Sequence, residues 1–386
     1  MAKGYNPQVY EVAYTTLAEL NAASSKTFVE GDIITDADIT AATGLAWQQL
    51  AITGAISDNN FVVEPLESEQ YGEHSRGNIT VKGFENPNGF FTINHYPGIS
   101  TVHKKIIEAG LGKEVANSGH SGQTASDTHN STTVDLVAGH TLDSSDEGLF
   151  VAMGSEIGVI EDITGDVMTL KYPITASAGV VAIVKNHFNP DELSEDVFIL
   201  FVRTEKDAYL VSFVRFAVDF ETPKRSLFQL KFNYQGDVPR PSTLTMDTLG
   251  TLTSEANTKA ITTTAFKRIK LGSSPDFCLN NFNLKLTREQ QRLDCQATES
   301  LNNNGGTFQD KYMFELDVTT YDNNLRTNYD NNDYISIFAQ RGDLAFYSQG
   351  GLIKNENPTT INDNVLTTTY EIGANVDMQT QPIIYI

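Results

Sequence analysis

LVSFVRFAVDFETPKRSLFQLKFNYQG, residues 210–236, is the stretch that decides the fold. Its first part alternates polar residues with the apolar residues Val214, Phe216, Val218 and Phe220. Its second part, after the turn residues 222–224, does the same with Phe228, Leu230, Phe232 and Tyr234. A period of two over two such runs predicts a long antiparallel hairpin with one apolar and one polar face. Because two strands alone bury too little surface to be stable in water, further sheet must cover the apolar face.

The composition is that of a globular protein with an unusual charge. The 386 residues suffice for a substantial core and for two or three domains. Hydrophobic residues make up 40% of the chain and aromatic residues 10%, which excludes a disordered protein. The 27 basic residues against 49 acidic ones leave a net charge of -22, and such a surface repels nucleic acid and anionic membranes. The excess acid therefore serves solubility or the repulsion of a polyanion.

Cysteine usage and hydropathy indicate the compartment. Two cysteines, Cys278 and Cys295, are too few for a secreted domain built on disulfides. The opening residues MAKGYNPQVYEV lack the apolar segment of a signal peptide. No run of about 18 apolar residues occurs that could span a membrane. We therefore expect synthesis in a cytoplasm and no membrane partner.

The first hundred or so residues predict short elements followed by a hairpin and a helix. Residues 1–60 are rich in turn signals and indicate irregular structure with short strands, with a short helix over Thr16–Ala23. Gly77–Tyr96 predicts a second hairpin, with its turn at Asn86–Gly89. Apolar residues at helical spacing then predict an amphipathic helix over Ser100–Gly112, with glycine as the stop.

A small all-β module is expected within the first half of the chain. Gly119–Thr133 lacks apolar periodicity, which predicts a linker. Short alternating runs separated by glycine and aspartate turns then fill residues 130–186. The host domain resumes at Val197–Val202, VFILFV, which runs into the hairpin at 210–236. This order indicates an insertion rather than a separate domain.

The second half repeats the design of the first. Asp237–Thr264 is rich in threonine, proline and serine and predicts a linker. Residues 282–297 then predict a hairpin with its turn at Arg288–Gln290. Further strands are expected at 311–319, 334–339, 344–347, 367–372 and 383–386, and a short helix at 322–331. The expected domains are 1–129 with 187–237 as the first, 130–186 as the inserted module, 238–264 as a linker and 265–386 as the second.

No catalytic constellation emerges from the motifs. The glycine-rich nucleotide-binding, metalloprotease and CxxC patterns are all missing, and Gly119–Gly122 does not match a nucleophile elbow. His120, His129 and His140 lie in or beside the Ser/Thr-rich segment without paired carboxylates at ligand spacing, so solvated loops are favoured over a metal site. Residues 322–333 lack the central glycine and final glutamate of an EF-hand loop. We therefore expect no enzyme, no catalytic or cofactor-binding residues, no metal site and no cofactor.

Several segments resemble the tail tube proteins (major tail proteins) of long-tailed, siphovirus-type bacteriophages. SFVRFAVDFETPKRSLFQLKFNYQGD is similar to the hairpin of that family, with a short polar turn and an aromatic-x-Gly ending. SRGNITVKGFENPNGFFTINHYPGISTVHKKIIEAGLG resembles its hairpin followed by a helix, and the module at 134–186 resembles its small β inserts. FCLNNFNLKLTREQQRLDCQATES and KYMFELDVTTYDNNL repeat the scheme. The resemblance covers most of residues 70–386, and residues 1–60 depart from it.

The resemblance implies a mostly β chain with tandem tail-tube-type β-sandwich or barrel domains, each with a flanking α-helix, plus the small all-β insertion. Long strands of such domains join those of neighbouring chains into a barrel around a channel, and ring closure removes exposed sheet edges. The implied role is a structural subunit of a virion tail, assembled in the host cytoplasm, whose stacked rings let DNA pass into the host. The implied partners are further copies of the chain, a tape measure protein and genomic DNA in the lumen without specific binding, and tail terminator and distal tail proteins at the ends.

Two expectations follow for the assembly. Acidic residues on the polar faces of the hairpins are candidates for the channel lining, namely Asp219, Glu221, Glu315 and Asp317. A negative lumen would not bind the DNA that passes through it. Two tube-type domains in one chain predict a ring of three chains with pseudo-sixfold symmetry, whereas six chains are needed if only one half contributes strands.

Three other functions are weighed against the tube subunit. A distal tail or hub protein would share the fold and differ in its copy number per virion. A carbohydrate-binding β-sandwich adhesin would need aromatic side chains exposed on one face, but most aromatic residues here fall at expected core positions. A polysaccharide hydrolase has only unassigned carboxylates in its favour, because a catalytic pair cannot be chosen without geometry.

Overall fold

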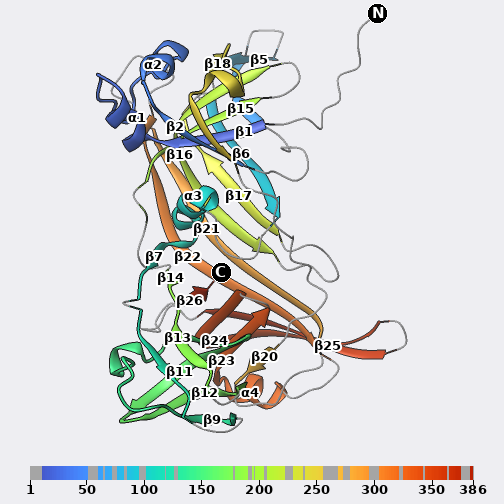
Figure 1. The fold of residues 1–386 in the computed structure, drawn as a ribbon. Helices are drawn as coiled ribbons and strands as arrows, with labels where there is room; N and C mark the ends of the chain where they lie inside the picture. The colour runs from blue at the N-terminus through green and yellow to red at the C-terminus, as the bar shows by residue number, and fades with distance from the viewer. Residues whose placement is uncertain are drawn as a thin grey trace, which may run out of the picture.

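Figure 1 shows the chain in a computed structural model, which is mostly β-structure. The described residues contain four α-helices, which are α1 (Leu17–Ala23), α2 (Asp36–Ala41), α3 (Thr101–Leu111) and α4 (Arg326–Asn331). The structure describes residues 11–50, 60–63, 66–71, 76–81, 85–94, 101–117, 119–125, 129–176, 179–189, 194, 196–203, 207–221, 229–237, 240–254, 268–272, 279–294, 304–320, 325–341, 344–362, 365–374 and 383–385.

A nine-stranded sheet, called the first sheet, contains the hairpin that decides the fold. Its order is β19 (Thr251–Ser254), β2 (Ala46–Leu50), β1 (Glu11–Thr16), β15 (Phe198–Arg203), β16 (Ala208–Glu221), β17 (Gln229–Gln235), β6 (Glu85–Asn94) and β3 (Asn60–Val63), with β18 (Arg240–Ser242) also paired to β16. β16 and β17 pair antiparallel, with Phe216 opposite Tyr234, so the predicted hairpin is confirmed. All its described strand pairs are antiparallel except β19 with β2.

β16 contains a bulge that changes which face its side chains occupy. Phe213 has a φ of 52°, and the register with β15 shifts at this point. As a result, Val211 and Val214 both point to the same core although three positions separate them. Gly236 makes room for the bulge, because a Cβ there would lie 2.8 Å from Val214 and 2.9 Å from Val211. The final glycine of the hairpin segment is therefore required by packing.

A second nine-stranded sheet shares its core with the first. Its order is β21 (Leu279–Asp294), β22 (Asn304–Thr320), β25 (Val365–Ala374), β24 (Leu344–Asn362), β26 (Ile383–Tyr385), β14 (His187–Asn189) and β7 (Lys113–Val115), and β23 (Tyr334–Arg341) joins β24 to β20 (Arg268–Leu271). The shared core contains Phe216 and Phe232 of the first sheet and Leu316 and Tyr370 of the second. Helix α3 adds Ile106 to this core. The face of each sheet that points away from it is called the outer face.

The helices predicted over Thr16–Ala23 and Ser100–Gly112 are confirmed as α1 and α3. Helix α1 begins after Thr16, whose hydroxyl accepts a hydrogen bond from the Glu19 amide while the Glu19 carboxylate accepts one from the Thr16 amide. Helix α3 buries one face in the shared core, as its apolar spacing predicts. It ends at Gly112, which has a φ of 112°.

The inserted residues form a small closed barrel, called the barrel. Its order is β8 (Ser121–Gln123), β13 (Val181–Val184), β10 (Phe150–Met153), β11 (Glu156–Thr164), β12 (Val167–Ala176) and β9 (His129–Asp135). The two end strands meet at the Thr124–Leu136 bridge, where the Ala125 amide donates to the Asp135 carbonyl at 2.7 Å. The closed sheet surrounds its own apolar core, which includes Val151, Leu170 and Ala182.

Two predicted turns are wrong because the strands run through them. Asn86–Gly89 lies inside β6, and residues 76–81 form β5 (Arg76–Val81), which pairs with β4 (Leu66–Tyr71) rather than with β6. In the described chain Pro87 pairs only with β3, so its missing amide costs no bond to β17. Arg288–Gln290 lies inside β21, where a register shift absorbs the break in alternation.

The two predicted linkers contain strands instead. Residues 119–133 supply β8 and part of β9 to the barrel. Residues 237–264 supply β18, a 3₁₀ turn (Met246–Thr248) and β19 to the first sheet, and Leu244, Met246 and Leu249 pack on its outer face. Short strands with few apolar residues carry no periodicity, so composition alone favours loops there.

Figure 1 shows how these parts are arranged along the molecule. The first sheet lies at one end, the barrel lies at the other, and the long strands β21 and β22 run between them. The strands β7 and β14, which lead into and out of the barrel, pair with each other, and β26 joins them to β24. In the described part of the chain, no helix is long and apolar enough to cross a membrane.

Candidate functional site

The two long hairpins lie side by side. β16 of the first sheet runs next to β21 of the second, so the hairpins β16–β17 and β21–β22 together form a half-barrel (Figure 1). β21 and β22 have 16 and 17 residues, which exceeds the usual strand length of about 3–10 residues. At about 3.3 Å per residue, β22 is roughly 55 Å long. β25 pairs with β22 only over residues 315–320, so most of the hairpin β21–β22 extends beyond this pairing.

Two of the four predicted acidic residues lie on the outer face of the second sheet. Leu316 and Val318 of β22 are buried in the shared core. Glu315 and Asp317 alternate with them, and Glu315 is exposed while Asp317 is half-buried. The alternation along β22 therefore places both acids where the sequence predicts, on the polar face of the strand.

Glu371 is a third acid on this face that sequence reasoning missed. It pairs directly with Asp317 across β22 and β25. The side chain of Glu371 is exposed, whereas its neighbours Tyr370 and Ile372 are buried in the shared core. The alternation of residues 367–373 carries the signal for Glu371, but only the strand pairing shows that it lies opposite Asp317.

Uncharged polar side chains surround these acids. The amides of Asn355 and Asn357 donate to Glu371 at 3.5 and 3.4 Å. The hydroxyls of Thr319 and Thr369 lie 3.0 Å apart across β22 and β25. We call this surface the polar face, and its described members are Glu315, Asp317, Thr319, Asn355, Asn357, Thr369 and Glu371.

The polar face is rich in hydrogen-bond acceptors and is negatively charged. Like charges directly opposite each other on a sheet are destabilising, so the pairing of Asp317 with Glu371 costs stability. Lys354 brings a cation to the area, since its stem packs over Gly373, the residue that pairs with Glu315. Lys285 of β21 pairs directly with Glu315, so three acids on these strands stand against two lysines. Such a surface attracts water and cations and repels phosphates.

The other two predicted acids are located by their backbone only. Asp219 pairs with Lys231 and Glu221 pairs with Gln229 in the hairpin β16–β17. Their side chains lie outside the described part of the structure. The structure therefore places the four predicted acids on two neighbouring hairpins, and it describes the side chains of Glu315 and Asp317.

The barrel covers another region of the second sheet's outer face. Phe338 and Tyr347 of the sheet pack against barrel residues such as Phe150. The buried guanidinium of Arg268 donates to the Ile157 and Pro173 carbonyls at 3.0 and 2.5 Å and lies over the Phe338 ring. Side-chain bonds to strand carbonyls fix the barrel in one position.

Two further hydrogen bonds hold the barrel on this face. The Gln340 side chain accepts from the Ile157 amide at 3.1 Å and donates to the Ser155 carbonyl at 3.0 Å. The Tyr172 hydroxyl donates to Ser336 at 2.7 Å. Burial raises the pKa of Tyr172 to about 12, so its hydroxyl keeps the proton that it donates.

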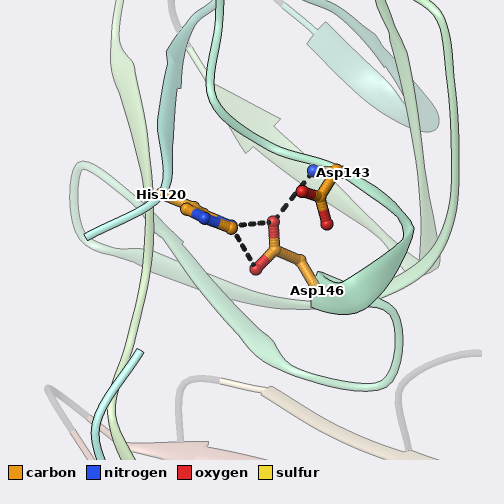
Figure 2. A group of neighbouring side chains, drawn as sticks. All are labelled: His120, Asp143 and Asp146. Atoms are coloured by element: carbon orange, nitrogen blue, oxygen red, sulfur yellow. Dashed lines mark hydrogen bonds and ion pairs between the residues drawn. The ribbon is translucent and has the colours of Figure 1, made fainter. Parts of the chain in front are cut away.

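The three histidines of the predicted loop have different environments. The Nδ1 atom of His120 lies 3.0 and 2.9 Å from the two carboxylate oxygens of Asp146, and Asp143 lies beside this pair (Figure 2). His140 is buried, with Nε2 3.1 Å from the Gly165 carbonyl. The side chain of His129 lies outside the described residues. The fold thus brings His120 to two carboxylates that are more than 20 residues away in sequence.

Comparison with known protein families and curated proteins identifies no relative of this chain. No protein-family model matches the chain, and no curated protein matches its sequence.

Proposed function

We propose that the chain is a structural subunit of the tail tube of a long-tailed bacteriophage. In this proposal its two β-rich halves act as tandem tail-tube-type domains, and the half-barrel of one chain continues into that of the next. The role is structural rather than catalytic. Rings of the chain stack into a tube in the virion tail, through which DNA passes into the host.

The observation that carries the proposal is the polar face beside the two long hairpins. Much of the outer face of the first sheet is covered by apolar side chains of residues 17–45 and 244–249, and the barrel covers part of that of the second, whereas Lys231 and Asn233 of β17 are half-buried polar residues outside these clusters. The polar face instead keeps Glu315 and Glu371 exposed to solvent, on a chain with a net charge of -22. A wall of this kind suits a water-filled channel that a polyanion crosses without binding.

The proposal assigns partners by the same logic. Further copies of the chain extend the half-barrel, because closing it into a ring removes exposed strand edges. A tape measure protein and the genomic DNA occupy the channel in turn without specific contacts. Tail terminator and distal tail proteins end the tube.

Electron microscopy of the purified protein tests the proposal most directly. We expect hollow rings or tubes with a uniform channel. Mass measurement of a ring should give three chains, with a pseudo-sixfold view down the axis, if both halves contribute strands. Six chains in a ring would mean that only one half of each chain contributes strands to the channel wall. Rings that never stack would assign the distal tail role, and a protein that stays monomeric at high concentration would exclude both roles.

A charge reversal on the polar face tests its place in the channel. We expect the double variant Glu315→Lys with Glu371→Lys to assemble like the unmodified chain but to retain DNA at low salt. Retention should fall steeply as salt rises, because contacts with phosphates release counterions. Glu147→Lys is the matched control, since Glu147 is an exposed acid beside the barrel. If the control retained DNA equally well, or if the double variant retained none, the polar face would not line the channel.

A further inference from the structure

Three side chains with metal-binding atoms meet beside β8 of the barrel. His120 Nδ1, an Asp143 carboxylate oxygen and an Asp146 carboxylate oxygen all lie within 4.8 Å of one another. Figure 2 shows the imidazole ring of His120 edge-on to the Asp146 carboxylate, with Asp143 on the other side of that carboxylate. Because Zn²⁺ lies about 2.0–2.2 Å from nitrogen and carboxylate ligands, two of its ligand atoms are at most about 4.4 Å apart, so small side-chain adjustments bring these three atoms onto one ion.

The local fold holds each of the three residues in place. The His120 carbonyl accepts from the Val184 amide at 3.0 Å, which ties this residue to β13. Asp143 is the N-cap of the 3₁₀ turn η1 (Ser144–Asp146), and the side chains of Asp143 and Asp146 each cap the other's backbone. A site whose ligands are already oriented loses little conformational entropy when an ion binds.

The hydrogen bonds within the group do not occupy every lone pair of the two carboxylates. One oxygen of Asp143, Oδ1, accepts from the Ser145 amide and hydroxyl at 2.7 and 2.5 Å. The Asp143 amide donates to Oδ2 of Asp146 at 3.0 Å. Oδ1 of Asp146 faces His120 Nδ1 at 3.0 Å and keeps a second lone pair for a cation, and Oδ2 of Asp143 keeps lone pairs as well.

The three side chains differ in how far they are exposed to solvent. The Asp146 side chain is 4% exposed and the His120 side chain is 22% exposed, whereas Asp143 is exposed. A buried carboxylate is costly unless a partner neutralises it. An ion that entered past Asp143 would meet two carboxylates and one imidazole, and it would neutralise Asp146 more fully than His120 alone.

We propose that His120, Asp143 and Asp146 bind a divalent transition-metal ion of the Zn²⁺ class. Imidazole nitrogen with carboxylate oxygen suits zinc and its first-row neighbours rather than Mg²⁺, which prefers oxygen ligands alone. The three protein ligands leave a fourth position for water. Binding requires the proton of His120 to reside on Nε2, so that Nδ1 offers its lone pair.

The bound ion acts as a clip for the barrel. It strengthens the link between the residue that leads into β8 and the turn η1, which the contact of His120 with Asp146 already brings together across the 22 residues between His120 and Asp143. Because the three ligands meet only in the folded chain, binding stabilises the folded barrel by mass action. This inference departs from the sequence-based expectation of a solvated loop around His120, and it does not depend on the proposed tube.

Calorimetric titration of the chelator-treated full chain with Zn²⁺ tests the site. We expect one ion per chain and no comparable binding of Mg²⁺. His120→Gln and Asp143→Asn should each weaken Zn²⁺ binding by more than about 100-fold, since even an outer partner of a metal ligand is worth roughly 10- to 100-fold. Asparagine caps a helical turn as well as aspartate does, so Asp143→Asn keeps η1 folded. The control is Asp166→Asn, because Asp166 lies 3.6 Å from His140 and no third metal-binding side chain joins this pair among the described residues.

Co²⁺ absorption gives a second readout that does not depend on heat. We expect visible absorption bands with the unmodified chain and with Asp166→Asn, and their loss in His120→Gln and Asp143→Asn. Zn²⁺ should raise the thermal unfolding midpoint of the unmodified chain and of Asp166→Asn, and it should leave the midpoints of His120→Gln and Asp143→Asn unchanged. Absence of Zn²⁺ binding at millimolar concentration would overturn the proposal, as would binding that survives both ligand substitutions.

Discussion

The outer faces of the two nine-stranded sheets differ although both sheets share one core. On the first sheet, Phe201 and Phe213 point outward and are buried by a cover formed by residues 17–45 and 244–249. On the second sheet, Glu315 and Glu371 point outward and stay exposed. The pattern of apolar residues in a strand therefore indicates whether one or both of its faces are buried.

The strand β15 makes this visible in the sequence. Its residues 198–202, FILFV, are apolar without interruption, and all five are buried. A continuous apolar run is expected where a strand is covered on both sides. Residues 315–318 of β22 and 370–372 of β25 alternate polar and apolar residues instead, which is expected where one face meets water.

Polar contacts hold the cover of the first sheet in place. Asp36 accepts hydrogen bonds from Ser242 and from Thr243, which links α2 to the segment after β18. Arg215 of β16 pairs with Glu30 at 2.8 Å. Lys105 of α3 pairs with Glu19 of α1 at 2.6 Å. The apolar cover is thus fixed at its edges by bonds between segments distant in sequence.

The largest effect is expected from opening the covered face of the first sheet. Phe201→Ala should lower the free energy of unfolding by about 3–5 kcal/mol, because it leaves a cavity under the cover. Urea unfolding followed by tryptophan fluorescence measures this, since Trp47 is the single tryptophan and is buried in the same cover. The matched variant Thr369→Ala on the polar face should cost less than about 1 kcal/mol. Equal losses in the two variants would remove the distinction between the faces.

A smaller effect is expected where the barrel covers the second sheet. Arg268→Ala removes hydrogen bonds from a charged group to two barrel carbonyls, and it should cost about 1.5–3 kcal/mol. The Ile157 amide, which faces the same contact, should exchange its hydrogen faster in this variant. Lys171→Ala is the control, because its exposed pair with Glu161 at 3.0 Å is worth roughly 0–1 kcal/mol. Unchanged exchange at Ile157 would show that the barrel is held without Arg268.

Acid should loosen the cover of the first sheet. Burial raises the pKa of Asp36, but hydrogen bonds from Thr243 and Ser242 outweigh burial and hold the pKa below its ordinary value. Burial also raises the pKa of Glu19, and bonds from Lys105 and Thr16 again lower it below the ordinary value. A lowered pKa in the folded state contributes stability that is present above the ordinary pKa and is lost as pH falls through the folded one.

Trp47 fluorescence against pH measures this loss. We expect the emission to shift toward that of solvated tryptophan as pH falls below about 4, the range of unperturbed carboxyl groups. Asp36→Asn should flatten the profile, because the titrating group of this contact is gone. A profile that Asp36→Asn leaves unchanged would mean that Asp36 does not hold the cover.

The smallest effect is expected on the polar face itself, and it has the opposite sign. Glu371→Gln should raise the free energy of unfolding by about 0.2–1 kcal/mol, because it removes a like charge opposite Asp317. The gain should shrink at high salt, which screens exposed charges. Urea midpoints at two salt concentrations measure it, with Glu147→Gln as the control. A loss of stability in Glu371→Gln would show that its bonds with Asn355 and Asn357 outweigh the repulsion.

Part of the candidate site could be predicted from the sequence. Alternation along residues 311–319 correctly puts Glu315 and Asp317 on a polar face. Glu371 was missed because its relation to Asp317 depends on the pairing of β22 with β25, across 54 residues of chain. The group of His120 with Asp143 and Asp146 was missed for the same reason, since those residues meet only when the barrel closes.

The sequence by itself determined the elements whose pattern is local and strong. These include the hairpin β16–β17, the helix α3 with its glycine stop and the apolar strand β15, because periodicity and turn chemistry act within a few residues. Only the tertiary structure decided which strand pairs with 85–94, that residues 240–254 join the first sheet, and that β21 continues through Arg288–Gln290. Those choices depend on packing between distant segments, where the free energy belongs to the pair of segments and neither segment carries it alone.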